Sequence, residues 1–158
     1  MKKNKSKKFK ALFVCTGNTC RSPMAEIIVR TELKKRGKAE EYAVSSAGLC
    51  ADGASPIAKN ANAALKAFGI APSRRRSKLL TPAAVKRADA VICMSDAHKN
   101  AVRGLNGHTA TYGEIAGGGD VPDPYGGDLD RYKQTAGFFI RTAPAVVDYL
   151  EKMRESTE

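Results

Sequence analysis

A chain of 158 residues, 42% of them hydrophobic, fits one domain with a sizeable core and leaves no room for a second domain of ordinary size. The net charge is +11, but lysines among the first ten residues supply six of these charges, so the remainder carries only +5. This balance suits anionic partners such as phosphorylated proteins. A nucleic-acid partner is not expected, because a solvated lysine tail accounts for most of the excess charge.

Nothing in the sequence indicates a membrane protein or a secreted protein. No stretch reaches the roughly 18 consecutive apolar residues of a membrane span, and the apolar run after the lysines is too short for a secretory signal. We therefore expect a cytoplasmic protein without a membrane partner.

The cysteines and histidines do not indicate a metal site. The four cysteines form no paired zinc motif, and structural disulfides are not expected in the cytoplasm. These cysteines are Cys15, Cys20, Cys50 and Cys93. His98 and His108 have no Glu or Cys at ligand spacing. Both histidines are therefore expected on the surface, and neither a metal nor another cofactor is predicted.

The chain begins with a lysine-rich segment, residues 1–8, which has no apolar period and is expected to be a disordered basic tail. A single domain is predicted for residues 9–158. Its first strand is the apolar run Phe9–Val14. Apolar residues at helical spacing after Ser22-Pro23 then predict a helix with one buried face, which ends near Gly37.

The loop between this strand and this helix is predicted to bind phosphate. It runs Cys15-Thr16-Gly17-Asn18-Thr19-Cys20-Arg21-Ser22 and ends at a helix N-terminus. Gly17 lets the backbone approach a ligand closely, and Asn18 tolerates a left-handed conformation. The free N–H groups of the loop and the helix dipole favour a bound dianion. We therefore expect the residues from Thr16 to Ser22 to bind phosphate.

Cys15 and Arg21 stand at opposite ends of this loop, where a thiolate and a guanidinium would face a bound tetrahedral anion from two sides. A cysteine beside a helix N-terminus and an arginine is commonly a thiolate and therefore a nucleophile at neutral pH. The planar fork of arginine can hold two phosphoryl oxygens, and Ser22 can donate to the sulfur. A cysteine, five residues and then Arg-Ser together indicate phosphoryl transfer through the cysteine.

Further strands and helices alternate along the rest of the chain. Strands are predicted at residues 42–47, 90–94 and 110–112, and helices at residues 57–68, at 81–87, after Ser95 or Asp96, and at 129–153. Pro144 is a position where the last helix could kink or divide. This alternation predicts an α/β fold with one doubly wound sheet of about four parallel strands and helices on both faces. Ligands of such sheets gather at the carboxyl ends of the strands, where the Cys15 loop lies.

The segment from Cys15 to Glu26, Cys-Thr-Gly-Asn-Thr-Cys-Arg-Ser-Pro-Met-Ala-Glu, resembles the signature of the low-molecular-weight protein tyrosine phosphatases. The resemblance continues at Ser46-Ala47-Gly48, at Cys93-Met94 and at Asp120-Val121-Pro122-Asp123-Pro124-Tyr125. It therefore covers nearly all of the chain after the tail.

This resemblance implies that Cys15 is the nucleophile, Arg21 the phosphate binder and Asp123 the general acid of a metal-free reaction on phosphorylated proteins. Pro122 and Pro124 bracket Asp123 and would stiffen its backbone. Asp120 is the nearest competitor for the role of the acid. The expected mechanism passes through a phosphocysteine intermediate.

The resemblance leaves two substrate classes open. Tyrosine phosphatases of this family generally wall the pocket with aromatic residues, whereas the corresponding residues here are Asp52 and Tyr125, the latter followed by two glycines. Many tyrosine phosphatases carry a bulkier apolar residue at the position of Thr19. A threonine there makes the loop resemble that of the protein arginine phosphatases of the family. Phosphoarginine is therefore the preferred prediction, with Thr19, Tyr125 and Asp52 as substrate-binding residues. A tyrosine phosphatase proper, in which Thr19 is only a small loop residue, is the alternative.

Two other functions fit the sequence less well. Related arsenate reductases share the loop but need two redox cysteines close together downstream, and Cys93 has no such partner. An inactive phosphate-binding module is disfavoured because Cys15, Arg21 and Asp123 are all present.

Two features remain with two interpretations each. By the same resemblance, Cys20 is expected to form a reversible disulfide with Cys15 on oxidation, and a packing role in the core is the other interpretation. The basic run Arg74–Arg76 either steers phosphoproteins or is a solvated charge run.

Overall fold

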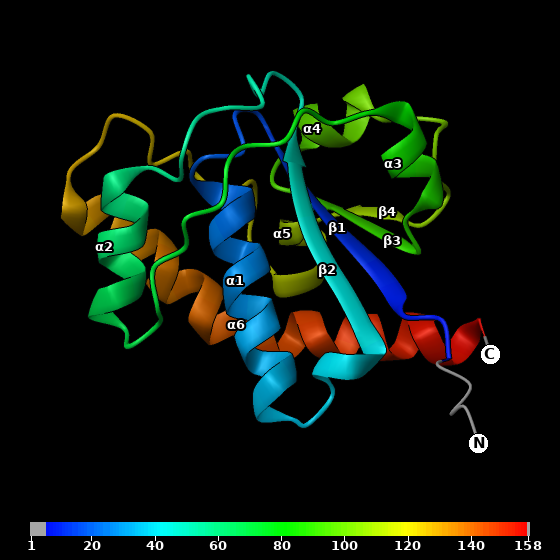
Figure 1. The fold of residues 1–158 in the computed structure, drawn as a ribbon. Helices are drawn as coiled ribbons and strands as arrows, with labels where there is room; N and C mark the ends of the chain where they lie inside the picture. The colour runs from blue at the N-terminus through cyan, green and yellow to red at the C-terminus, as the bar shows by residue number, and fades with distance from the viewer. Residues whose placement is uncertain (1–5, 158) are drawn as a thin grey trace.

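Four parallel strands form the sheet at the centre of the fold (Figure 1). The computed structural model describes residues 6–157. Its strands are β1 (Phe9–Cys15), β2 (Tyr42–Gly48), β3 (Ala90–Cys93) and β4 (Thr109–Thr111), in the order β2-β1-β3-β4. The predicted sheet of about four parallel strands is confirmed. Because β1 lies between β2 and β3, the loop that follows it has a neighbouring strand end on each side.

All of the predicted helices are present, together with two short ones that the sequence did not predict. They are α1 (Arg21–Lys35), a short 3-10 helix (Ala39–Glu41), α2 (Lys59–Ala67), α3 (Pro82–Arg87), α4 (Asp96–Ala101), α5 (Tyr112–Ala116) and α6 (Leu129–Ser156). Side-chain caps begin four of them. Thr81 accepts the Ala84 N–H before α3, and Ser95 accepts the His98 N–H before α4. Thr111 accepts the Glu114 N–H before α5, and Asp128 accepts the Arg131 N–H before α6. No helix within residues 6–157 is long and apolar enough to span a bilayer.

Alternation along β1 divides the core into two layers. Ala11 and Phe13 belong to the larger cluster, which α1, α2, α5 and α6 complete. Leu12 and Val14 belong to a smaller cluster that includes Val85 of α3. Successive strand residues point to opposite faces of a sheet, and both faces here are buried. The prediction of helices on both faces is therefore confirmed.

The structure differs from the predicted elements at Tyr112 and at Pro144. Tyr112 was expected to end the last strand, but it begins α5, because the Thr111 hydroxyl accepts the Glu114 N–H and turns the chain into a helix. Pro144 does not divide α6, which runs as one helix along α1 and α2 and buries Val146 and Val147 beyond the proline. Packing compensates for the missing hydrogen bond.

The expected disordered tail, residues 1–8, lies mainly outside the described residues. Its last three residues, Ser6, Lys7 and Lys8, are exposed and precede β1 without helix or strand.

Candidate active site

The phosphate loop lies at the carboxyl end of the sheet, between Cys15 at the end of β1 and Arg21 at the start of α1 (Figure 1). The end of β2 holds it from one side, because the Cys50 N–H donates to the carbonyl oxygen of Thr16 at 2.9 Å. Gly48 permits this approach. A Cβ at Gly48 would lie 2.5 Å from the Thr16 carbonyl oxygen, closer than carbon and oxygen can pack.

Asn18 fixes the shape of the loop from inside. It has φ +55°, and among residues 6–157 it is the one non-glycine residue with a positive φ, as its sequence predicts. Its Oδ1 accepts the Lys78 N–H at 2.9 Å, which identifies the opposite amide atom as nitrogen. That Nδ2 donates to the hydroxyl oxygens of Ser22 at 2.8 Å and Ser46 at 2.9 Å. Two segments distant in sequence, at Ser46 and Lys78, therefore fix this loop residue together with the nearby Ser22.

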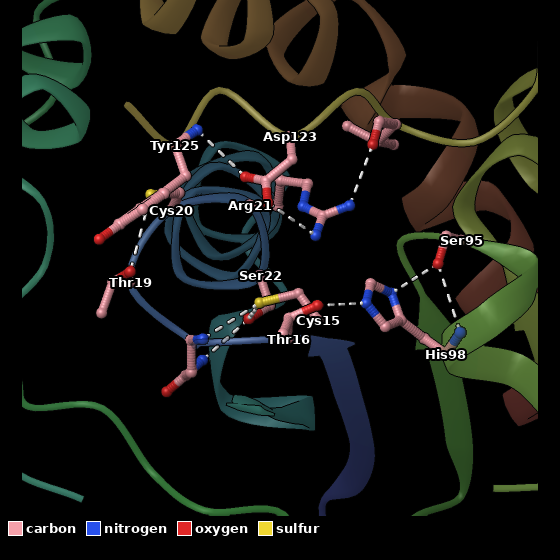
Figure 2. Close-up of polar contacts among 12 residues, drawn as sticks. Cys15, Thr16, Thr19, Cys20, Arg21, Ser22, Ser95, His98, Asp123 and Tyr125 are labelled. Atoms are coloured by element: carbon pink, nitrogen blue, oxygen red, sulfur yellow. Dashed lines mark hydrogen bonds and ion pairs between the residues drawn. The ribbon is translucent and has the colours of Figure 1, made fainter. Parts of the chain in front are cut away.

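The Cys15 sulfur lies where these contacts converge (Figure 2). It is 2.7 Å from Ser22 Oγ and 3.3 Å from the backbone nitrogen of Asn18. Because Ser22 Oγ already accepts a hydrogen bond from Asn18, its own hydrogen can point at the sulfur. Two hydrogen-bonding groups, the Ser22 hydroxyl and the Asn18 N–H, thus face the Cys15 sulfur. Ser22 is fully buried and does not line the pocket described below, so its hydroxyl acts on the sulfur.

Arg21 joins the phosphate loop to the loop that carries Asp123. Its Nη2 lies 3.4 Å from Asp123 Oδ2, and its Nη1 donates to the carbonyl oxygen of Val121 at 3.2 Å. Arg21 is buried, whereas the Asp123 side chain is 50% exposed. The other oxygen, Asp123 Oδ1, accepts the Tyr125 N–H at 3.1 Å. The three residues that the sequence assigns to catalysis therefore meet in one place.

A pocket of about 310 Å³ opens at this point. The loop residues 15–21 line it together with Cys50, Asp52, Ser55, Asp123 and Tyr125. Tyr125 is 77% exposed and contributes the one aromatic ring among the described residues that line this pocket. The structure thus brings all three residues assigned to substrate binding, Thr19, Tyr125 and Asp52, to the pocket wall.

The Asp52 carboxylate already accepts hydrogen bonds from its own loop and from Ser77, 25 positions away. Oδ1 accepts the backbone N–H groups of Ala54 and Ser55 at 2.9 and 2.8 Å and the Ser77 hydroxyl at 2.9 Å, and Oδ2 accepts the Ser55 hydroxyl. The Ser55 hydroxyl is the largest of these influences, and together they hold the pKa of Asp52 far below its usual range. Asp52 is therefore a fixed negative charge that shapes the pocket wall.

Cys20 also lines the pocket, and its thiol makes a hydrogen bond with a side chain of α6. Its sulfur lies 3.3 Å from the Tyr132 hydroxyl, and burial raises the pKa of the Cys20 thiol. Cys93 lies in β3, fully buried, and burial raises its pKa to about 12. All four cysteines are free thiols in this structure.

His98 was expected on the surface, and this expectation is wrong. The ring is 5% exposed, in the first turn of α4, with Nε2 2.9 Å from Thr16 Oγ1 and Nδ1 3.0 Å from Ser95 Oγ (Figure 2). Burial, and then the positive charge of Arg21, lower the pKa of His98. No potential metal ligands lie near His98 in the sequence, and its partner Thr16 is 82 positions away. No local sequence pattern could therefore have predicted that His98 is buried beside the loop. His108 is exposed, as expected.

Within residues 6–157, no group of three or more His, Cys, Asp or Glu side chains could hold a metal ion. The reactive groups that line the pocket include the Cys15 thiol, the Arg21 guanidinium and the Asp123 carboxylate.

Comparison with known proteins gives a consistent result. The sequence model of the family "Low molecular weight phosphotyrosine protein phosphatase" matches residues 10–155. The protein-arginine-phosphatase of Bacillus subtilis is 38% identical over 130 residues, which are 78% of this chain and 85% of that protein. The low molecular weight protein-tyrosine-phosphatase PtpB of Staphylococcus aureus is 34% identical over 130 residues, 80% of this chain and 88% of that protein.

Solved structures agree with this match. The arginine phosphatase YwlE, in a mutant whose active-site serine is phosphorylated, superimposes with a TM-score of 0.82 at 34% identity and covers 93% of this chain and 99% of its own. The fold and the sequence motif thus point to the same family.

Proposed function

Because the chain belongs to the low molecular weight phosphotyrosine protein phosphatase family, and is thus a cysteine-dependent hydrolase of phosphorylated proteins, we propose that Cys15, Arg21 and Asp123 form its catalytic centre. The observation that carries this proposal is the convergence of these three side chains on one pocket. Thr16 to Cys20 surround the same pocket and supply the backbone N–H groups for the phosphoryl oxygens.

In the first step the Cys15 thiolate attacks phosphorus, an S–P bond forms, and the bond from phosphorus to the leaving oxygen or nitrogen breaks. Asp123 gives its proton to the leaving atom. Before this step the phosphate must take the place of Asp123 on the Arg21 guanidinium, because the two side chains are ion-paired in the free protein. Arg21 then donates to two phosphoryl oxygens, and the Asp123 carboxyl is available to the leaving group.

In the second step a water molecule attacks phosphorus, the S–P bond breaks, and Asp123 takes the proton that the water loses. Cys15 leaves as a thiolate. Its stability as a leaving group comes from the Ser22 hydroxyl at 2.7 Å and the Asn18 N–H at 3.3 Å. A phosphorylated active-site serine in the YwlE mutant supports an intermediate bound at the position of Cys15.

Phosphoarginine is the preferred substrate in this proposal. The Thr19 hydroxyl has one described contact, at 3.7 Å from the Cys20 sulfur, and is therefore available to a guanidine nitrogen. The fixed negative charge of Asp52 and a wall with little aromatic surface favour a cationic, polar substrate stem over a phenol ring. The 38% identity to a protein-arginine-phosphatase supports the same preference.

Phosphotyrosine is the second candidate, and one observation favours it. The Tyr125 ring is 77% exposed at the pocket edge, where it could pack against the ring of a phosphotyrosine.

The deciding experiment measures kcat/KM on two peptides of identical sequence, one with phosphoarginine and one with phosphotyrosine at the same position. We expect the phosphoarginine peptide to be the better substrate. A higher kcat/KM for phosphotyrosine would favour the second candidate. p-Nitrophenyl phosphate serves as a substrate independent of this choice, and the absence of turnover on it would remove the proposed catalytic centre altogether.

A further inference from the structure

His98 is a buried imidazole beside the phosphate loop that the mechanism above does not use. It belongs to α4, and its ring bridges two hydroxyls, Thr16 Oγ1 at 2.9 Å and Ser95 Oγ at 3.0 Å. Ser95 Oγ also accepts the His98 backbone N–H at 3.3 Å. Figure 2 shows the ring aimed at Thr16, the residue that directly follows the nucleophile.

The surroundings of the ring, burial above all, favour its neutral form. Burial and Arg21 of α1 lower the pKa of His98, while Asp120 and Asp123 of the acid-bearing loop oppose this with a smaller effect. A neutral imidazole has one N–H donor and one acceptor nitrogen. In either tautomer it can therefore bond to both hydroxyls at once, as a donor to one and an acceptor from the other.

The start of α4 is itself tied to both catalytic loops. Residue Met94 donates its N–H to the carbonyl oxygen of Val14, at the end of β1, and accepts the Val121 N–H, each at 2.9 Å. Two residues later the Asp96 N–H donates to Asp120 Oδ1 at 2.9 Å. The turn that carries His98 is thus held against the nucleophile strand on one side and the Asp123 loop on the other.

We propose that His98 is a positioning residue, which holds Thr16 through its hydroxyl and thereby sets the direction of the loop N–H groups that receive the phosphoryl oxygens. This inference rests on the proposed phosphate site. Thr16 is an exposed residue whose carbonyl oxygen is held by the Cys50 N–H and whose hydroxyl is held by His98. Because it is the first residue after Cys15, a change in its rotation moves the N–H groups relative to the sulfur. Small displacements of such donors are costly, because a misplacement of about 1 Å can reduce a rate roughly 100-fold.

Two amide substitutions separate the two bonds of the ring. The amide nitrogen of glutamine takes the place of Nε2, next to Thr16, and that of asparagine takes the place of Nδ1, next to Ser95. We expect His98→Asn to lower kcat/KM on p-nitrophenyl phosphate roughly tenfold and to weaken inhibition by inorganic phosphate, since a displaced loop binds the anion less well. His98→Gln should recover most of both values.

Thr16→Val removes the hydroxyl at the other end of the contact without changing the size of the side chain. We expect it to reproduce the loss seen in His98→Asn, and the double variant to lose no more than either single variant, because all three lack the same hydrogen bond. His108→Asn, at the exposed histidine, is the matched control and should leave the kinetics unchanged.

The outcomes distinguish this inference from the proposed function. If His98→Asn and Thr16→Val both keep the wild-type kcat/KM and phosphate inhibition, His98 has no positioning role, although the catalytic centre stands. If His98→Asn does not fold, as its Tm would show, Thr16→Val decides alone: wild-type kinetics there overturn the inference. Losses that add in the double variant would likewise contradict a shared bond. Absence of turnover in the unmodified protein would instead count against the proposed function.

Discussion

The two loops that meet at Arg21 are built in opposite ways. The phosphate loop lies between buried strand ends, and Asn18, Cys15 and Ser22 are all nearly inaccessible to solvent. The loop that carries Asp123 contains several glycines; the Asp123 side chain is 50% exposed and Tyr125 77% exposed. This loop, here called the acid loop because we propose Asp123 as the general acid, is held at Asp120 by the Asp96 N–H and at Val121 by the carbonyl oxygen of Met94, before Asp123 is reached.

This difference separates two tasks. Groups that stabilise charge on sulfur and phosphorus act best when their positions are fixed before the substrate arrives. A loop that must release an arginine, give a proton to a leaving group and admit water needs freedom to adjust. Substitutions in the two loops should therefore impair different properties of the protein. Each prediction below tests one of the two loops or the residues that contact it.

The largest effect on activity is expected in the phosphate loop, whose buried residues make it the more rigidly fixed of the two and which is called the fixed loop below. Cys15→Ser should reduce turnover of p-nitrophenyl phosphate to background while inorganic phosphate still binds, because a serine hydroxyl without a general base is a poor nucleophile and the N–H groups of the loop remain. Steady-state kinetics and phosphate titration by calorimetry measure the two properties. Residual turnover comparable to the wild type would remove Cys15 from the mechanism.

The acid loop should show a loss that depends on the substrate. Asp123→Asn should lower kcat by about 10²- to 10⁴-fold for poor leaving groups and much less for good ones, because only poor leaving groups need the proton in the transition state. A series of aryl phosphates with increasing leaving-group pKa measures this slope. An equal loss across the series would argue against Asp123 as the acid, and Asp120→Asn is the control that should leave the slope unchanged.

The response to peroxide tests whether Cys20, in the same loop, protects Cys15 against irreversible oxidation. We expect peroxide to oxidise the Cys15 thiolate to a sulfenic acid, which then condenses with the Cys20 thiol, releases water and forms a disulfide. Cys20 must first leave Tyr132, because the two side chains are hydrogen-bonded in the reduced protein. Treatment with peroxide and then dithiothreitol should restore most activity in the wild type and little in Cys20→Ala. Equal recovery of both proteins would exclude the disulfide.

A smaller effect is expected where the pocket wall meets the substrate. Thr19→Ile should change the ratio of kcat/KM for phosphoarginine over phosphotyrosine by about tenfold in favour of phosphotyrosine, since one apolar branch in a pocket is worth roughly 10-fold or more in discrimination. Paired peptides of one sequence give the ratio directly. If the ratio does not change, Thr19 does not select the substrate.

The smallest effect concerns stability. The pKa of folded His98 lies below its ordinary value of 6.5, so the unfolded chain binds more protons as the pH falls through that value. The stability that the neutral ring contributes is present above pH 6.5 and is lost below it. Urea midpoints from about pH 7.5 down to about pH 5 should therefore fall more steeply for the wild type than for His98→Gln. Parallel slopes would show that the ring does not titrate differently in the two states.

The fixed loop was also the part that the sequence predicted best. The residues from Cys15 to Ser22 are consecutive and lie between a clear strand and a clear helix, so their order predicted the thiol at one end of the loop and the guanidinium at the other. The tolerance of asparagine for a left-handed conformation predicted the positive φ of Asn18. The helix caps at Thr81 and Ser95 were equally local.

What the sequence did not predict depends on contacts between distant segments. The burial of His98 follows from its contact with Thr16, and the saturated Asp52 carboxylate depends in part on Ser77, 25 positions away. Tyr112 has the side chain of a strand residue, but a local cap and its packing against Phe139 place it in a helix. Properties of this kind require the assembled fold.

The central place of β1 in the sheet has a consequence for the newly made chain. Ala11 of β1 pairs with Ala90 of β3, and the phosphate loop is complete only when Asn18 meets Lys78 and Thr16 meets His98. Cys15, which we propose as the nucleophile, is synthesised before the segments that hold its loop, which follow some 60 to 80 positions later. A nascent chain therefore carries its reactive thiol long before it can hold a phosphate, and catalytic activity reports that folding has passed β3 and α4.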